Sequence, residues 1–200
     1  MASRESIGRK RVEETLRTVT ERTAGVTGGD FFHALLLHLS EALKVSYALI
    51  SECTDDTRTE VRTLAFWTHD RFVENVTYSL AGTPCEHVIA GDVCYHPVDV
   101  QNLFPMDTGL IRLHIAGYLG VPLYDTTGAV LGHLAVMDEK PMPYTPQDVA
   151  ILNIFATRAS AEMLRKRSEM ALHQEIAECR RTEEALRKAL DEVEVLKNRL

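Results

Sequence analysis

Two apolar segments separated by a short polar turn dominate the hydrophobic pattern of the chain. They cover residues 117–124 and 129–137, and Asp125-Thr126-Thr127-Gly128 lies between them. Both are too short to cross a membrane and are rich in strand-forming residues. Asp suits the first position of a type I turn, and Gly accommodates the left-handed residue that closes such a loop. The pattern therefore predicts an antiparallel hairpin. Because its second strand is apolar on both faces, helices must cover both faces of the sheet.

Helical and strand-like periodicities predict the elements around this hairpin. Apolar residues recur with helical spacing over 31–44, and strand-like segments follow at 46–52 and 60–68. We expect a short helix at 83–90. Residues 98–116 mix turns and short helix, and we expect them to form the wall of any pocket. The predicted fold class is α+β, with a central antiparallel sheet between helices.

The end of the chain predicts one long helix. It begins at Thr145-Pro146-Gln147-Asp148, which combines a hydroxyl cap, a proline and an acid in the first turn, and neither proline nor glycine follows. From residue 172 onward, nine positions alternate in steps of four and three, as in a coiled-coil seam. Seven of the nine are apolar: Leu172, Ile176, Cys179, Leu186, Leu190, Val193 and Leu200. The seam predicts a homodimer.

The register of this seam slips before residue 172. Arg165 and Glu169 stand where apolar residues are due, and such a phase break locally unwinds or overwinds a coil. The alternative to a dimer is an amphipathic helix that folds back on its own domain. Residues 1–22 carry a thin apolar stripe, which indicates either a second helix at the dimer interface or a frayed tail.

These patterns divide the chain into three parts. Residues 1–24 form an N-terminal helix or tail, residues 25–165 a globular domain and residues 166–200 a coiled-coil linker. The linker ends in mid-seam, so we expect an output domain beyond residue 200.

Charge and cysteine content narrow the function classes. Lys and Arg total 22 against 29 Asp and Glu, and the net charge of -7 argues against direct nucleic-acid binding. No signal peptide precedes the four cysteines, which indicates reduced cytosolic thiols rather than a disulfide scaffold. No apolar run is long enough to span a membrane. We therefore expect a cytoplasmic protein without membrane contact.

Several segments together resemble a GAF domain, the small-ligand sensor module of signalling proteins. The last hairpin of that family resembles GVPL–YDTTG–AVLGHLAVMD, and the likeness extends through LAGTPCEHVIAGDVCYHPVDVQNLFPMD to YTPQDVAIL. The end of the chain, EEALRKALDEVEVLKNRL, resembles the linker that follows sensor domains in sigma-54-dependent activators, and similar linkers lead into histidine kinases. The resemblance implies a non-enzymatic input module that senses a small ligand or redox signal and passes it through a dimeric coiled coil.

The resemblance also indicates where a ligand pocket lies. We expect it among Cys85, His87, Asp99, Phe104, Asp107, Arg112, His114 and Tyr118, with His133 on the central strand. Each of these side chains also has an ordinary structural interpretation, so the prediction concerns the region more than any single residue. The resemblance identifies neither the ligand nor a cofactor.

Two Cys-x-His pairs, Cys85 with His87 and Cys94 with His96, are candidate metal ligands. Thiolate and imidazole groups bind zinc, iron or haem iron. Their spacing does not match a zinc finger, and on a helix Cys85 and His87 point in nearly opposite directions. The alternative is that both cysteines are small buried residues.

Other activities of GAF-type proteins fit less well. Methionine sulfoxide reductases of this fold need a second cysteine before the last hairpin, and residues 104–111 contain none. Met137-Asp138-Glu139-Lys140 stands where cyclic-nucleotide-binding relatives carry an Asn-Lys-Phe-Asp-type signature, and the adjacent Cys-His pair of bilin-binding relatives is missing. A structural dimerisation module without a ligand is the remaining alternative.

Overall fold

The computed structural model of the chain describes residue 17 and residues 28–197, with side chains as far as residue 188. It divides into two compact units, Met1–Glu162 and Met163–Leu200, which we describe separately. The helix expected at 1–22 lies, apart from Arg17, outside the described residues. Among the described helices, none is long and apolar enough to cross a membrane.

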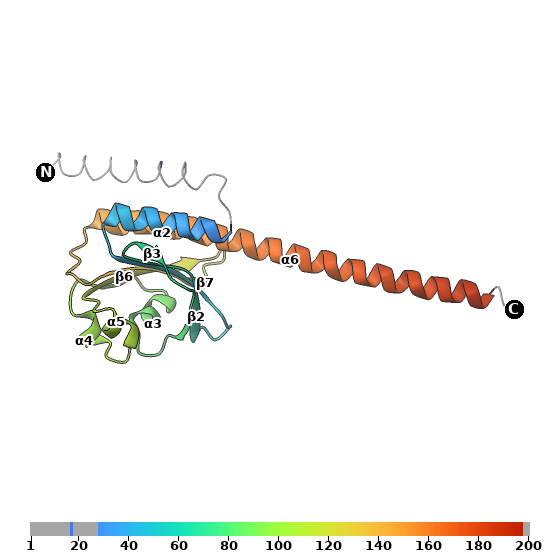
Figure 1. Cartoon of the computed structure of the whole chain (residues 1–200), viewed down its shortest axis with the longest axis horizontal. Coiled ribbons are helices and arrows are strands. Elements are labelled where there is room, and N and C mark those ends of the chain that lie inside the picture. Colours follow the sequence, from blue (N-terminus) through green and yellow to red (C-terminus); the bar gives the residue numbers. More distant parts are fainter. Residues whose placement is uncertain (1–16, 18–27, 198–200) are drawn as a thin grey trace. The chain divides into compact units, whose positions relative to one another are not determined.

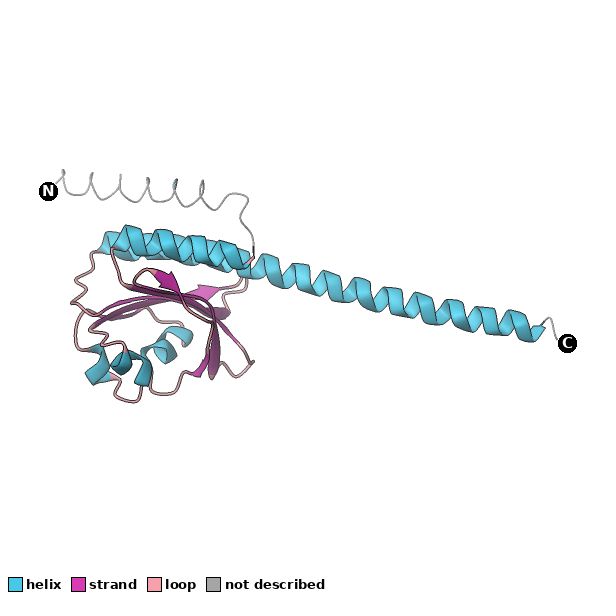
Figure 2. Cartoon of the chain, in the orientation of Figure 1, coloured by secondary structure: helices cyan, strands magenta, loops and turns pink. Residues whose placement is uncertain are grey.

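A seven-stranded antiparallel sheet forms the centre of the first unit (Figure 2). Its order is β3-β2-β1-β7-β6-β5, and β4 pairs with β2. The strands are β1 Tyr47–Cys53, β2 Glu60–Thr68, β3 Arg71–Phe72, β4 Thr77–Ser79, β5 Cys94–His96, β6 Gly117–Tyr124 and β7 Val130–Asp138. The central position belongs to β7 and β1, so the predicted hairpin strand β7 lies in the interior of the sheet.

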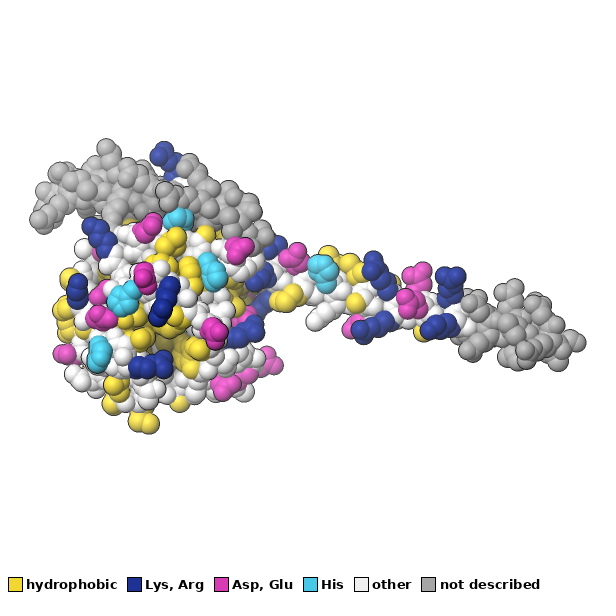
Figure 3. All heavy atoms as spheres, in the orientation of Figure 1, with side chains coloured by type: hydrophobic (Ala, Val, Ile, Leu, Met, Phe, Trp, Pro, Cys, Tyr) yellow, Lys and Arg dark blue, Asp and Glu magenta, His cyan; other side chains and the backbone are white. Residues whose placement is uncertain are grey.

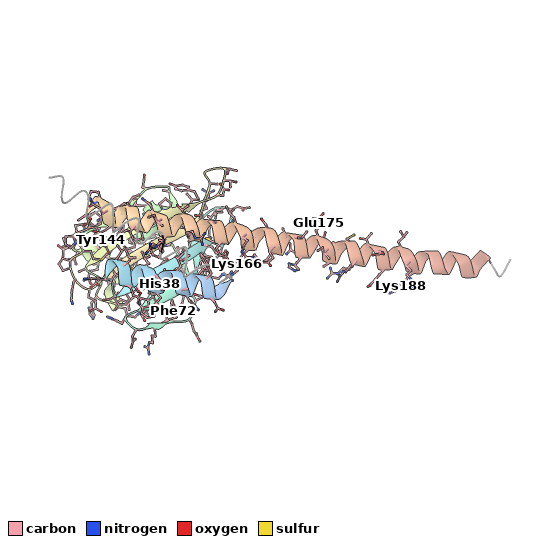
Figure 4. The ribbon with its side chains drawn as sticks, turned by 90° about the horizontal axis from the view of Figure 1, so that it is seen from above. His38, Phe72, Tyr144, Lys166, Glu175 and Lys188 are labelled. Atoms are coloured by element: carbon pink, nitrogen blue, oxygen red, sulfur yellow. The ribbon has the colours of Figure 1, made fainter. Side chains whose placement is uncertain are left out.

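Helices cover both faces of the sheet, as the apolar pattern of β7 predicted. They are α2 Gly29–Leu43, α3 Pro84–Ile89, α4 Val100–Leu103, α5 Thr108–Arg112 and α6 Pro146–Lys197. Figures 1 and 4 show α2 side by side with the first part of α6 on one face, while Figure 1 shows α3, α4 and α5 beneath the other. The predicted α+β fold, an antiparallel sheet between helices with a long C-terminal helix, is confirmed.

The turn between β6 and β7 is held by one aspartate. Asp125 Oδ1 accepts hydrogen bonds from the backbone N–H groups of Thr127 and Ala129, each at 2.8 Å. Gly128 adopts a φ of 87°, a left-handed conformation that glycine tolerates at little cost. All nine residues of β7 are buried, and seven of the eight in β6. The hairpin predicted from the sequence is therefore confirmed in its turn as well as its strands.

The first part of α6 joins the hydrophobic layer above the sheet. Ile151, Leu152 and Phe155 are fully buried. Thr145 and Asp148 form the predicted helix start: the Thr145 N–H donates to Asp148 Oδ2 at 2.9 Å, and the Asp148 N–H donates back to Thr145 Oγ1 at 3.4 Å. This reciprocal pair of hydrogen bonds fixes the residue at which α6 begins.

Glu162 ties α6 to the start of α2. Its Oε1 accepts a hydrogen bond from the Gly28 N–H at 2.9 Å, across 134 residues of sequence. The Glu162 side chain is buried, and Gly28 is partly buried. The two helices above the sheet are therefore linked by a specific bond as well as by apolar packing.

In the second unit, residues 163–197 continue α6 as regular helix. Four apolar residues of the predicted seam are exposed in the described part: Leu172 at 56%, Ile176 at 42%, Leu186 at 61%, and Cys179. The two polar residues at the register slip bind each other, because Arg165 Nη1 lies 3.0 Å from Glu169 Oε2. The break in the seam register therefore coincides with an ion pair between residues one helical turn apart.

β7 approaches β1 so closely that one position admits only glycine. A Cβ atom at Gly132 would overlap the Ser51 carbonyl oxygen and lie 2.8 Å from the Glu52 Cα. Both are backbone atoms, so relief requires the two strands to separate. Gly29, at the start of α2, provides a contrast, because a Cβ atom there would meet nothing within 4 Å.

We predict that Gly132→Ala lowers the free energy of unfolding by roughly 3 kcal/mol, the upper range for overpacking a core. Gly29→Ala, the matched control, should leave stability unchanged or raise it slightly, because alanine is the better helix former. Urea denaturation followed by circular dichroism measures both. Equal midpoints for the two variants would contradict the close approach of β7 and β1.

Candidate functional site

A cavity of about 400 Å³ lies in the first unit, between the sheet and the short helices α3 and α5. This is within the range of small-molecule sites. Its apolar walls include Leu49, Phe66, Leu110, Leu113 and Met137. Figure 3 shows a hollow edged by hydrophobic side chains on this unit, with basic side chains beside it. The shape and lining suit a compact, largely apolar molecule.

Hydrogen-bonding groups form a chain from the middle of the sheet to the cavity wall. Ser51 Oγ lies 2.6 Å from His133 Nδ1, and His133 Nε2 lies 3.4 Å from the Tyr78 hydroxyl. The Tyr78 hydroxyl donates to Cys85 Sγ at 3.6 Å, and Cys85 Sγ lies 3.4 Å from the Tyr118 hydroxyl. The last three residues line the cavity. The cavity thus has one polar wall, supported from behind by His133.

Burial keeps this chain of groups uncharged at neutral pH. It lowers the pKa of His133 from 6.5 to about 3 and raises the pKa of Cys85 from 9.0 to about 11. It also raises the pKa values of Tyr78 and Tyr118 well above 10.0, and the neighbouring Cys85 adds to both shifts. The polar wall therefore offers neutral hydroxyl and thiol groups, with a neutral imidazole behind them.

Asp107 and Arg112 are the two ionisable acid and base side chains of the cavity lining. Asp107 Oδ1 caps α5 by accepting the N–H groups of Gly109 at 3.0 Å and Leu110 at 3.1 Å. Burial raises the pKa of Asp107, although these backbone hydrogen bonds oppose the shift. Arg112 lines the cavity from an exposed position in the last turn of α5.

The sequence of this chain also matches a known protein family. The family model described as GAF domain matches residues 11–163. The chain belongs to the GAF domain family. GAF domains are sensory modules of signalling proteins. A search of curated proteins found no match to the chain.

Solved structures of two GAF domains and of a bacteriophytochrome domain share the fold. The GAF domain of an Acinetobacter phosphoenolpyruvate-protein phosphotransferase is 16% identical with a TM-score of 0.65, covering 80% of this chain and 97% of that one. The A. aeolicus nlh2 GAF domain in an inactive state is 15% identical with a TM-score of 0.61, covering 80% and 99%. The chromophore-binding domain of Stigmatella aurantiaca bacteriophytochrome is 10% identical with a TM-score of 0.61, covering 76% and 60%. At these identities the likeness shows the fold alone.

Four of the nine residues predicted for the pocket line the cavity of this GAF domain: Cys85, Asp107, Arg112 and Tyr118. His133 lies one hydrogen bond behind the wall, through Tyr78. Sequence reasoning missed Tyr78, which comes from the three-residue strand β4. No local signal marks it, because so short a strand has no readable alternation.

The other four predicted pocket residues do not line the cavity. Asp99 precedes α4 with a φ of 60°, and His114 is exposed after α5 with a φ of 53°. The rings of His87 and Phe104 contact each other, with centroids 5.8 Å apart. Residues 98–116 do supply part of the cavity wall, as predicted, but through α5 and the loop before it.

The two Cys-x-His pairs do not converge. Cys85 and Cys94 are buried, whereas the rings of His87 and His96 lie against Phe104, His96 at a centroid distance of 5.3 Å. Burial and the nearby His87 lower the pKa of His96. Across residue 17 and residues 28–188, no three His, Cys, Asp or Glu side chains are placed to hold a metal ion. The arrangement favours structural roles for both cysteines.

The neutral His133 predicts a specific pH dependence of stability. Its pKa is about 3 in the folded protein against 6.5 ordinarily, so below pH 6.5 the unfolded chain gains a proton that the folded chain does not. Above pH 6.5 the neutral His133 ring makes its full contribution to the free energy of unfolding. This contribution falls as the pH is lowered toward 3, by at most about 1.4 kcal/mol per pH unit.

We expect His133→Gln to flatten this decline between pH 7 and pH 5, measured by urea denaturation at each pH. His173→Gln, at an exposed position of α6, serves as the control and should keep the wild-type slope. A wild-type slope in His133→Gln would show that the buried imidazole is not the titrating group.

Proposed function

We propose that this GAF domain is the sensory input module of a bacterial signal-transduction or transcription-regulatory protein. In this proposal a small organic ligand binds in the cavity, and a dimeric coiled coil formed by α6 carries the change to an output domain. The cavity of about 400 Å³ with its single neutral polar wall is the observation that supports it most. An apolar pocket with a few converging polar groups is the usual form of a ligand site.

Ligand binding is favoured over redox sensing by the state of Cys85. The reactive form of a cysteine is the thiolate. Burial raises the pKa of Cys85 to about 11, so the group is a thiol at neutral pH. Cys85, Cys94 and Cys179 form no disulfide, which agrees with a reducing cytoplasm.

The position of the sheet, between the cavity and the helices α2 and α6, supports a route for the signal from the ligand to α6. Met137 of β7 lines the cavity, and the same sheet carries α2 and the first part of α6 on its other face (Figure 1). A ligand that favours one curvature of the sheet would favour one packing of these helices, which is a population shift. The bond from Gly28 to Glu162 links the two helices at the end of the first unit.

A second copy of the chain is the proposed partner of α6. The exposed seam residues Leu172, Ile176 and Leu186 follow heptad spacing, and heptads pair in two-stranded coiled coils. Residues 1–24 are proposed to join the same interface. The output is proposed to be an ATPase of the AAA+ class or a histidine kinase.

We predict that Ala81→Trp abolishes ligand binding by filling the cavity mouth, while Ala81→Ser preserves it. Ala81 lines the cavity and is exposed, so the larger side chain need not disturb the core. A metabolite panel is screened by thermal shift. A ligand at 100 times its Kd stabilises by about 2.7 kcal/mol and raises Tm by roughly 5–10 °C. A panel without any shift would favour a ligand-free dimerisation module.

We further predict that Leu172→Asp with Leu186→Asp converts the dimer to a monomer, because paired carboxylates cannot be desolvated in the seam. Ala171→Asp with Ala185→Asp adds the same charge one residue earlier, on the outer face, and should leave a dimer. Sedimentation equilibrium distinguishes the two. A wild-type monomer, or dimers in both variants, would exclude the proposed seam.

A further inference from the structure

The tyrosines of the cavity wall lack a strong hydrogen-bond acceptor. The Tyr118 hydroxyl is fully buried, and its partner among the described residues is the sulfur of Cys85 at 3.4 Å. The Tyr78 hydroxyl lies 3.6 Å from the same sulfur and 3.4 Å from His133 Nε2. A thiol sulfur is a weak acceptor, and both Tyr78 contacts are long. Both hydroxyls therefore make only long or weak hydrogen bonds at the cavity wall.

These donors converge on one place. Tyr78 comes from β4 and Tyr118 from β6, and both contact the single sulfur of Cys85. A ligand oxygen near that sulfur can accept from both hydroxyls, because a carbonyl oxygen has two lone pairs. Ser51 and His133 hold Tyr78 from behind, so the donor is positioned before a ligand arrives.

The charges around the polar wall of the cavity disfavour an anionic ligand group beside the two tyrosines. His133 is uncharged, and Asp107, a carboxyl group of the cavity lining, acts electrostatically on Cys85 and raises the pKa of its thiol further. A ligand carboxylate at the tyrosines would be desolvated without a cation. Arg112, the cavity's basic residue, is exposed and lies on the short helix α5. A neutral acceptor needs no counter-charge.

We infer that the cavity takes a compact, uncharged, mostly apolar molecule whose carbonyl-type oxygen accepts hydrogen bonds from Tyr78 and Tyr118. Its apolar body packs against Leu49, Phe66 and Met137. This assignment of the ligand class rests on the proposed function of the cavity as a ligand site.

Three probes of similar shape test the assignment: acetophenone, cumene and benzoate. Cumene replaces the carbonyl oxygen by a methyl group, and benzoate replaces the acetyl methyl by a charged oxygen. Binding to the intact chain is followed by nuclear magnetic resonance of ¹³C-methyl methionine, because Met106 and Met137 line the cavity.

We expect acetophenone to bind about tenfold more tightly than cumene or benzoate, the combined factor for two hydrogen bonds of modest net strength. Tyr78→Phe and Tyr118→Phe should each remove most of this preference while leaving cumene binding unchanged, which also shows that the cavity stays folded. Tyr95→Phe is the matched control, because the Tyr95 hydroxyl bonds to the Met142 carbonyl, away from the cavity lining.

Other outcomes overturn the assignment in distinguishable ways. Equal affinity for cumene would indicate purely apolar selection. Tighter binding of benzoate that is lost in Arg112→Ala would indicate an anion site. In both cases the cavity still binds ligands, so the proposed function stands. Failure of all three probes overturns the neutral-acceptor class, and the proposed function fails with it only if the metabolite panel is also without effect.

Discussion

Burial of β6 and β7 on both faces is the constraint on which the rest of the structure depends. Strands without a solvent face require cover above and below, and this domain supplies two different covers. One is the continuous apolar layer of α2 and the first part of α6. The other is the looser group of α3, α4 and α5, which leaves a cavity of about 400 Å³. The same sheet therefore separates a closely packed helical layer from a cavity that can be filled.

The polar wall of the cavity follows from a second constraint, the cost of burying charge. Ser51, His133, Tyr78, Cys85 and Tyr118 can share a desolvated interior because each is neutral at pH 7. Neutrality gives the wall donors and acceptors without a net electrostatic field. It also makes Cys85 a poor nucleophile, so the wall suits recognition better than thiol chemistry.

Sequence patterns correctly predicted the features that are set by interactions between residues close in the sequence. The Asp125 turn, the Thr145 and Asp148 cap and the two-sided burial of β7 are each set by residues close in sequence. The polar wall was only half predicted, because Tyr78 and His133 are 55 residues apart and meet through the pairing of the sheet. The two Cys-x-His pairs were candidate metal ligands with an unfavourable spacing, and the described residues contain no group of three ligands placed to hold a metal ion.

Native mass spectrometry of the chain, purified without oxygen, tests the central claim most directly. The account predicts a dimer in which each protomer carries the added mass of one small organic molecule. Denaturing the same sample should release that molecule and return the mass of the bare polypeptide. A monomer would contradict the coiled coil, and a dimer of bare mass that takes up no molecule from a cell extract would contradict the sensor.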